Sequence, residues 1–387
     1  MKYKLFNTSV ARNIILSLLI SVGIIFSLTS CGNKNVNEHP TASENSNTST
    51  STGSSSSGNR IFTDTAERTL KIPENIKKVY SLSPVGNIMM YTLAPEKIAG
   101  LSSKVEKDDK RFLMQSYNEL PVLSGNFGQS ITMNTEEILK IQPDVIINMG
   151  NVDHTTIDGA QKIQEQLGIP VAVINFDLKT MGRAYEMLGE LTGDKVRAKE
   201  LGNYCTKVVN EINEAASKIP DEKRVRVYYA EGDKGLQTDP KGSHHTELLE
   251  LVRGINVADV AMQKGYGRSN VSQEQLMKWN PDRIIVCIDA GTPKEKNPYQ
   301  YIINDSTMKN LDAVKNKKVS AVPYHPFNWF DRPPSVNRII GVKWLANLLY
   351  PDIFNYDIRK ETKEFYEKFY HIKLTYTDVD EILENAG

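Results

Sequence analysis

The chain has 387 residues, of which 40% are hydrophobic and 24% charged, so it can build an ordinary globular core and is not disordered throughout. From residue 61 on it holds 42 basic and 45 acidic residues. This slightly acidic balance gives no support for nucleic-acid binding, which normally needs a basic surface. Its three cysteines, Cys31, Cys205 and Cys287, exclude a disulfide framework and match no metal-ligand spacing.

Residues 1–30 have the pattern of a processing signal. Basic residues at positions 2, 4 and 12 precede an apolar run over residues 14–28, which is short for a membrane-spanning helix. The run ends in Leu28-Thr29-Ser30-Cys31-Gly32, which resembles the lipobox of a bacterial lipoprotein. That resemblance implies cleavage before Cys31, lipidation of Cys31, and an extracytoplasmic protein held to the cell membrane by lipid alone. A plain secretory signal and an anchor helix are the alternatives.

Residues 31–60 follow as a predicted tether. Between residues 32 and 59, 18 of 28 positions are Ser, Thr or Asn, so the stretch has almost nothing apolar to bury and is expected to stay a flexible coil. A coil of this length reaches about 30 Å, which would let a folded domain move over a membrane surface without leaving it.

From residue 61 short β-branched runs alternate with amphipathic helical segments, which is typical of α/β folds with parallel sheets. The predicted strands cover residues 79–82, 98–101, 145–148 and 171–174 in the first half, and 225–229, 284–288 and 319–322 in the second. A helical stretch over 181–218, broken near Gly193-Asp194, separates the halves. We therefore expect an N-terminal lobe over 61–180 and a C-terminal lobe over 219–387, joined by one long helix.

An internal repeat relates the two lobes. Asn134-Thr135-Glu136-Glu137-Ile138-Leu139 leads to Pro143-Asp144 and a strand, and Ser272-Gln273-Glu274-Gln275-Leu276-Met277 leads to Pro281-Asp282 and a strand. In both copies the first Glu stands seven residues before the Pro. The same helix-turn-strand unit is therefore predicted once in each lobe.

Across residues 61–355 the chain resembles the substrate-binding lipoproteins of ABC importers that capture iron-siderophore, haem or cobalamin complexes. The resemblance rests on Thr63-Asp64 to Ser81-Leu82-Ser83-Pro84, the repeat, the segment from Tyr229 to Thr238 with Gly235-Leu236, and the late Trp329-Phe330 loop. It implies two three-layer α/β lobes with mostly parallel sheets, a ligand site between them, and a connecting helix that limits closure. The implied partners are a permease dimer and its ATPase, and we expect a monomer.

The resemblance further implies that one acidic residue on each lobe meets arginines of the permease, and the repeat assigns that role to Glu136 and Glu274. Two matched carboxylates, one on each lobe, can align a pseudo-symmetric protein with the two-fold axis of a permease dimer. The alternative is that both are merely favourable charges in the first turn of a capped helix.

Ligand contacts are expected at the carboxyl ends of the strands, where open α/β sheets place their binding crevices. Applied along the chain, that rule gives the candidate ligand-binding residues Ser83, Pro84, His154, Tyr229, Gly235, Leu236, Thr238, Tyr324, His325, Trp329 and Arg332. The resemblance adds Tyr266 and Arg268, which lie where cobalamin-binding members carry an aromatic contact.

The loop over residues 324–332 gathers four aromatic side chains, one proline and Arg332, and two further prolines, Pro333 and Pro334, follow it. Its flat apolar faces suit a large ligand better than an amino acid or a bare ion, and Arg332 suits an anionic ferric chelate. The alternatives are that Phe327 and Phe330 fill the lobe beneath and that Asp331 neutralises Arg332.

Four histidines outside the tether are candidate ligands of iron, haem iron or nickel, because imidazole suits these metals. His154 and His325 come first, ahead of His244 and His245. No pair has helical ligand spacing, and isolated loop histidines are usually solvated or capping groups.

These patterns predict a tethered binding protein that delivers a metal chelate to an ABC importer, needs no cofactor and catalyses nothing. A siderophore complex leads, with cobalamin, haem, a nickel chelate or an oxyanion as alternatives within the same fold. A binder of bare divalent metal is an alternative of another class. An extracytoplasmic enzyme is a further one, although the chain has no Gly-x-Ser-x-Gly elbow, phosphate loop or His-Glu-x-x-His pair.

Overall fold

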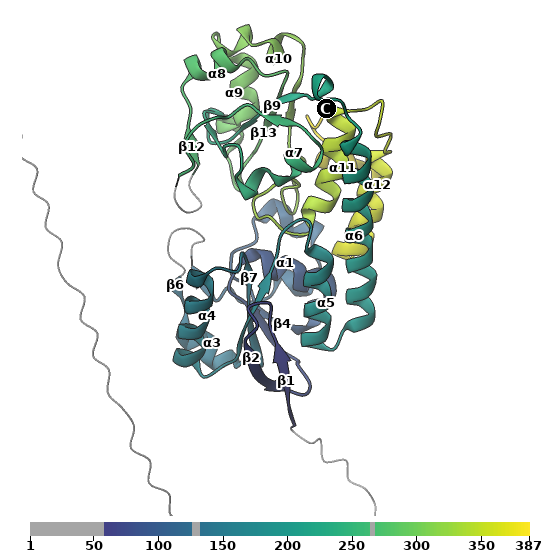
Figure 1. The fold of residues 1–387 in the computed structure, drawn as a ribbon. Coiled ribbons are helices and arrows are strands. Elements are labelled where there is room, and N and C mark those ends of the chain that lie inside the picture. The colour runs from purple at the N-terminus through teal and green to yellow at the C-terminus, as the bar shows by residue number, and fades with distance from the viewer. Residues whose placement is uncertain (1–57, 126–131, 264–267) are drawn as a thin grey trace, which may run out of the picture. The chain divides into compact units, whose positions relative to one another are not determined.

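The structure is a computed structural model that describes residues 58–125, 132–263 and 268–387, all within one compact unit. This unit has two lobes, each with a four-stranded parallel sheet between layers of helices (Figure 1), which confirms the predicted fold class. No helix in these ranges is long and apolar enough to cross a membrane. The predicted signal segment, Cys31, most of the tether and Tyr266 lie outside the described residues.

In the N-terminal lobe the strands follow the order β4-β3-β7-β8, and all pair in parallel. All four strands predicted there are present. The strands of this lobe are β1 Asn59–Thr63, β2 Thr69–Pro73, β3 Val79–Ser81, β4 Ile98–Gly100, β5 Ser124–Gly125, β6 Thr132–Met133, β7 Val145–Gly150 and β8 Val171–Asn175. Its helices are α1 Pro84–Leu93, α2 Gln115–Asn118, α3 Thr135–Ile141 and α4 His154–Leu167, with a 3-10 turn η2 at Lys107–Phe112.

Strand β7 shows why these strands read as continuous apolar runs. Val145 and Ile147 belong to the core cluster that includes α1 and the following helices, whereas Ile146 belongs to a second cluster with residues of α3 and α4. Because successive side chains of a strand point to opposite faces, a sheet covered on both faces needs apolar residues at every position. The N-terminal lobe is therefore a three-layer α/β/α unit.

The C-terminal lobe repeats this plan with the strand order β11-β9-β13-β14, again all parallel. Its strands are β9 Arg226–Ala230, β10 Gln237–Thr238, β11 Ile255–Asn256, β12 Ser269–Asn270, β13 Arg283–Val286 and β14 Val319–Ala321. Its helices are α7 Glu247–Leu251, α8 Gln273–Trp279, α9 Pro298–Asn304, α10 Asp312–Lys315, α11 Asn337–Leu349, α12 Ile358–Phe365, the π-helical turn η7 Tyr366–Tyr370 and α13 Tyr376–Ile382. The three two-residue strands β10, β11 and β12 were not predicted, because two residues are too short to show a pattern.

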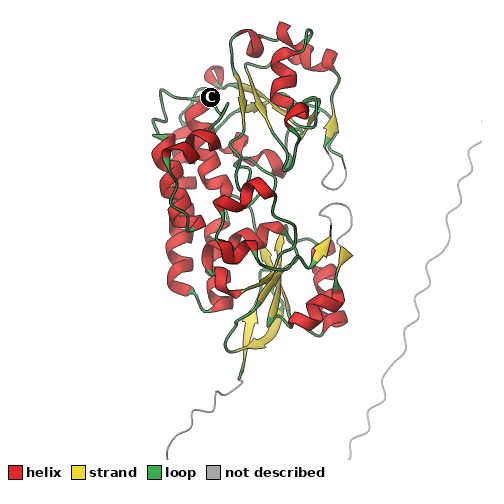
Figure 2. Ribbon diagram, turned by 180° about the vertical axis from the view of Figure 1, so that it is seen from behind, coloured by secondary structure: helices red, strands yellow, loops and turns green. Residues whose placement is uncertain are grey.

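The connection between the lobes is the predicted helical stretch over 181–218, which divides into two helices at the expected break near Gly193-Asp194. Helix α5, Met181–Thr192, ends at Gly193, whose φ of 89° only glycine adopts easily, and α6, Lys195–Ser217, follows. The two pack closely, since a Cβ added at Gly202 would lie 2.9 Å from the carbonyl oxygen of Gly182. Helix α6, of 23 residues and about 35 Å, runs along both lobes (Figure 2).

One hydrophobic cluster extends through both lobes. It contains Val145 of the first sheet and Ile285 of the second, together with buried residues of α1, α5, α6, α11 and the C-terminal helices. A hydrogen bond from the Tyr91 hydroxyl to the carbonyl of Tyr370, 2.6 Å long, ties α1 to the C-terminal segment. Any movement of one lobe against the other must therefore shear a shared core, which costs free energy.

Candidate functional site

The loops that follow β4 and β14 meet between the lobes. Asp109 of η2, only 4% exposed, accepts a hydrogen bond from the Tyr324 hydroxyl at 3.1 Å and lies 2.7 Å from His325 Nδ1. The His325 ring stacks on Phe112 with centroids 5.4 Å apart. Burial and the nearby Asp109 raise the pKa of Tyr324 above its usual value, so its hydroxyl is a permanent donor. These contacts join the two lobes at their strand ends.

Two arginines meet at one carboxylate in the C-terminal lobe. Glu231 follows β9 directly and is 0% exposed, and its Oε1 lies 2.8 Å from Nε of Arg268 and 2.8 Å from Nε of Arg332. Arg268 also makes a bidentate pair with Asp289, at 2.7 and 2.6 Å, and Arg332 donates to Asp239 at 2.6 Å. The arginines are thus held by carboxylates on both sides, as planar guanidinium groups require.

Local backbone features bring these distant residues together. Glu231 pairs with Gln237 across a turn with positive φ at Gly232 and Gly235, and β10 then pairs with β12, next to Arg268. In the late loop, Asn328 Oδ1 accepts the amides of Phe330 and Asp331 at 2.8 and 3.1 Å, which sets the turn before Arg332. Each charged group is therefore fixed by a hydrogen-bonded turn at a strand end.

Burial and ion pairing act against each other in this cluster. Burial raises the pKa of Glu231 to about 8, although Arg332 and Arg268 both act to lower it. Burial acts to raise the pKa of Asp289 as well, but hydrogen bonds from Arg268 hold it below its usual value. The pKa of Arg332 stays above its usual value because Glu231 and Asp331 outweigh its burial. The pair of arginines therefore remains positively charged.

Three buried groups, Asp239, His245 and Asp331, lie close enough together to hold one metal ion, the only such trio in the described ranges. Each residue of the trio already has an internal partner, because Asp239 binds Arg332 and Ser243, His245 Nδ1 is bonded to Asp331, and Asp331 Oδ2 lies 3.4 Å from Arg332 Nε. The trio is better explained as part of the network that orients Arg332. Neither His154 nor His325, the histidines favoured from sequence, belongs to it.

The other predicted ligand residues are scattered. Ser83 and Pro84 begin α1, with Ser83 Oγ 3.5 Å from the carbonyl of Met149, and exposed His154 begins α4. Gly235 provides a turn with a φ of 65°, and Leu236 packs against a core cluster of the C-terminal lobe. Of that set, the structure brings Arg268 together with Arg332 through Glu231, and Tyr324 together with His325 through Asp109.

Three predicted contacts are core residues instead. Trp329 and Tyr229 are 0% exposed and belong to the shared core, where the Tyr229 ring stacks on Phe330 with centroids 4.2 Å apart. Thr238 is also 0% exposed. These side chains present no surface to a ligand in this structure, because aromatic density in a loop indicates burial as readily as binding.

Sequence analysis missed Asp109, Glu231, Asp239 and Asp289. Asp289 was within reach of the strand-end rule, since it comes directly after the predicted strand over residues 284–288. Glu231 and Asp239 lie in or beside the segment from Tyr229 to Thr238, but no pattern shows that they face the arginines. Asp109 lies in a turn nine residues beyond the end of β4, where no sequence pattern indicated a ligand contact.

The repeat predicted around Glu136 and Glu274 is confirmed as a structural repeat. Each Glu is exposed in the first turn of a seven-residue helix, α3 or α8, whose N-cap side chain accepts from the third helical amide. Both helices end in a left-handed residue. In each copy the Asp after the Pro accepts a backbone amide at the start of the neighbouring strand segment. The two carboxylates are thus equivalently placed on the two lobes.

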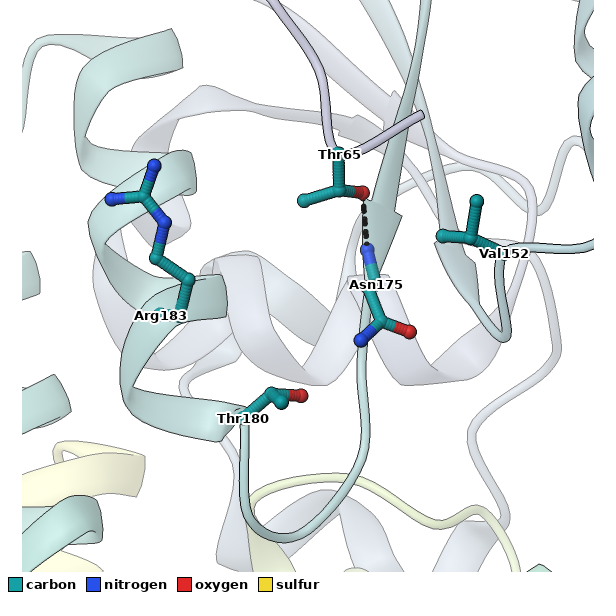
Figure 3. A pocket seen from close by; sticks show the side chains of 5 residues that line it. All are labelled: Thr65, Val152, Asn175, Thr180 and Arg183. Atoms are coloured by element: carbon teal, nitrogen blue, oxygen red, sulfur yellow. Dashed lines mark hydrogen bonds between the residues drawn. The ribbon is translucent and has the colours of Figure 1, made fainter. Parts of the chain in front are cut away.

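A separate open hollow of about 350 Å³ lies in the N-terminal lobe. It is lined by Thr65, Val152, Asn175, Thr180 and Arg183 (Figure 3), with the Thr65 hydroxyl accepting the Asn175 amide at 2.7 Å. It shares no lining residue with the arginine cluster, and Arg183 is already paired with Glu186 at 2.9 Å. Nothing in its lining matches the chemistry of the site between the lobes.

Comparisons with known proteins agree with this architecture. An ABC transporter solute binding protein from Sulfurospirillum deleyianum is 32% identical, superposes with a TM-score of 0.76, and is matched over 84% of this chain and 99% of its own. The molybdate-binding protein MolA of Haemophilus influenzae is 27% identical over 81% of this chain and 91% of its own. The iron(3+)-hydroxamate-binding protein YxeB of Bacillus subtilis is 23% identical over 54% of this chain and 64% of its own.

A family model described as periplasmic binding protein matches residues 103–324, which is more than half of the chain. That range begins before η2 and ends at the first residue of the late loop, so it includes Asp109, Glu231, Asp239, Arg268, Asp289 and Tyr324 of the site between the lobes but not His325 or Arg332. Together with the two-lobed fold and the full-length relatives, this match shows that the chain belongs to the periplasmic binding protein family and is a solute-binding protein of an ABC transporter.

Proposed function

We propose that this solute-binding protein captures an anionic, metal-containing solute between its lobes, with a molybdate-type oxyanion as the first candidate. The observation that carries the proposal is the pair Arg268 and Arg332, gathered at strand ends and fixed by Glu231. Arg332 keeps 23% of its side chain exposed, and no described residue accepts a hydrogen bond from its Nη1. This group is available to an incoming anion, and the molybdate binding of MolA supports that chemistry.

The dimensions of the site favour a small ligand. Asp109 bonds to Tyr324 and His325 across the lobes, and a Cβ at Gly291 would lie 3.6 Å from the carboxyl carbon of Glu106, so the strand-end loops already touch. The aromatic side chain first expected to stack on a large flat ligand, Trp329, is buried. Both observations argue against haem and cobalamin and support a compact oxyanion.

A ferric siderophore is the second candidate. Two relatives, YxeB and the petrobactin-binding protein YclQ, carry that ligand class in their names. Many ferric siderophores are anions, and Asp289, with 42% of its side chain exposed, could move aside with its arginine to admit one. A nickel chelate or bare divalent metal is supported less. Asp239, His245 and Asp331, which lie close enough together to hold one ion, already bond to protein groups.

The remaining expectations complete the transport role. Lipidation of Cys31 would hold the protein at the outer side of the cell membrane through the predicted tether. Glu136 and Glu274 would dock on the two permease subunits, whose ATPase drives uptake. Their exposed, equivalent positions on the two lobes support that assignment. The protein itself would act as a monomer, without a cofactor and without catalysis.

Calorimetric titration tests the ligand class. Purified protein is titrated with molybdate, with sulfate as a non-metal oxyanion, and with a ferric hydroxamate. Arg332→Gln should weaken binding of the true ligand about 10- to 150-fold, since a hydrogen bond to a charged group contributes about 1.5–3 kcal/mol. Arg183→Gln removes the same charge from the remote hollow and should leave affinity unchanged. Equal affinities in wild type and Arg332→Gln would refute the proposal.

A further inference from the structure

Glu231 occupies the place that an anion would take between the arginines. A single oxygen, Oε1, serves both Nε groups at 2.8 Å, and the side chain is 0% exposed. Its second oxygen, Oε2, is buried and accepts no hydrogen bond within the described ranges. A buried acceptor without a hydrogen bond costs free energy, and this cost is smaller for a protonated carboxyl group than for a carboxylate.

The same contacts make Glu231 an electrostatic competitor. When ionised, it supplies negative charge at short range to both guanidinium groups, and Coulomb interactions are strong in a buried site. When protonated, it can still accept through Oε1 and orient the arginines, but it no longer adds its own negative charge to those of Asp289 and Asp239, which stay paired with Arg268 and Arg332. The attraction of the pair for an external anion is therefore stronger when Glu231 is protonated.

We propose that Glu231 is a positioning residue and a built-in counter-ion for Arg268 and Arg332, so that its protonation strengthens capture of the anion and its ionisation weakens it. The inference rests on the proposed function, in that the arginines must be the anion-binding groups. It adds a specific residue and a direction of pH dependence to that function.

The surroundings of Glu231 leave it as the group that titrates in the working range. The groups that face it are Arg268, Arg332, Asp239, Tyr228, Tyr229 and Cys287. Burial raises the pKa values of both tyrosines and of the cysteine above their usual values, so these three stay neutral near pH 8. Both arginines stay charged because their pKa values lie above the usual range.

The sign of the effect follows from the direction of the shift. Burial raises the pKa of Glu231 to about 8, so the protonated form prevails below that pH. If only this form binds the anion well, the affinity of wild type for molybdate falls about tenfold between about pH 7 and pH 9. Glu231→Gln keeps a neutral acceptor in the same place, so its affinity should stay nearly constant over this range.

The experiment measures molybdate affinity by calorimetry at about pH 6, 7, 8 and 9. Wild type is compared with Glu231→Gln, with Glu231→Asp, which stays ionisable but is too short to reach both arginines, and with Glu186→Gln. Glu186 is exposed and lies on the N-terminal lobe, so this last variant should reproduce wild type. Glu231→Asp should bind more weakly yet keep a pH dependence. The same pH slope in wild type and Glu231→Gln would overturn the proposal.

Failure of the proposed function gives a different result. Wild type that binds no molybdate at about pH 7 would refute the oxyanion assignment before any question about Glu231 arises. Thermal melts without ligand then decide the role of Glu231. A pKa above the ordinary carboxyl value of 4.5 means that stability falls as pH rises from about 5 to about 8 in wild type, but not in Glu231→Gln. Superimposable melting curves across that range would overturn the titration of Glu231.

Discussion

Replacing Trp329 by alanine should destabilise the protein and leave the ligand affinity of its folded fraction unchanged. Trp329 is 0% exposed and belongs to the core shared by both lobes. Its backbone is fixed as well, because its amide donates to the carbonyl of Pro323 at 3.1 Å and its own carbonyl faces Gly341 of α11. The surrounding structure can collapse little into the space, so the substitution leaves a cavity.

The size of the loss can be worked out from this burial. Truncating a buried tryptophan to alanine costs about 3–5 kcal/mol. At about 2.1 cal/mol/K per residue, the roughly 320 described residues have an unfolding entropy of about 0.7 kcal/mol/K. A loss of about 4 kcal/mol therefore lowers Tm by about 6 °C. Trp279→Ala is the matched control, since Trp279 is only partly buried on α8 and should cost clearly less.

Thermal melts of the ligand-free proteins and calorimetric titration together check the reasoning. Calorimetry is preferred because fluorescence changes when a tryptophan is removed. If the Tm of Trp329→Ala lies within about 2 °C of wild type and its ligand affinity is tenfold weaker, Trp329 contacts the ligand. That result would refute its assignment to the core.

Three further predictions concern packing, docking and anchoring. Gly341→Ala should cost at least about 1–3 kcal/mol in a chemical-denaturation curve, because its Cβ would lie 1.7 Å from the Trp329 carbonyl oxygen; unchanged stability would contradict this contact. Glu136→Ala and Glu274→Ala should reduce cellular uptake, while the ligand affinity measured by calorimetry stays at the wild-type value. Normal uptake by the double variant would contradict the docking assignment. Cys31→Ser should move the protein from the membrane to the soluble fraction and leave its ligand affinity unchanged. Cell fractionation checks the location, and mass spectrometry checks whether wild-type Cys31 carries lipid.

The fold was accessible from local patterns because each pattern has a local cause. Parallel strands buried on both faces favour apolar residues at successive positions, as in Val145 to Ile147, and this run is visible without any tertiary information. The helix-Pro-Asp-strand repeat around Glu136 and Glu274 was equally visible, because capping residues, a left-handed helix end and a strand start follow one another within a few residues.

Short elements and helix packing were less accessible from the sequence. The break near Gly193-Asp194 was expected, and Gly193 ends α5 there through a positive φ, so that α5 and α6 pack on each other. The two-residue strand β11 depends on its neighbour β9 and carries no periodic pattern of its own. The close packing of the two helices and the pairing of β11 are both set by the packing partner.

The site between the lobes depended on tertiary structure almost entirely. A strand end indicated where Arg332 would lie and the family resemblance pointed to Arg268. Their shared partner Glu231 comes from a third segment, and only the turn with Gly232 and Gly235 aims it at both. Ion pairs between segments far apart in the chain have no characteristic spacing, so they cannot be predicted from one sequence. The same holds for burial: the aromatic loop was correctly expected at the end of β14, yet whether Trp329 faces ligand or core is decided by α11 packing against it.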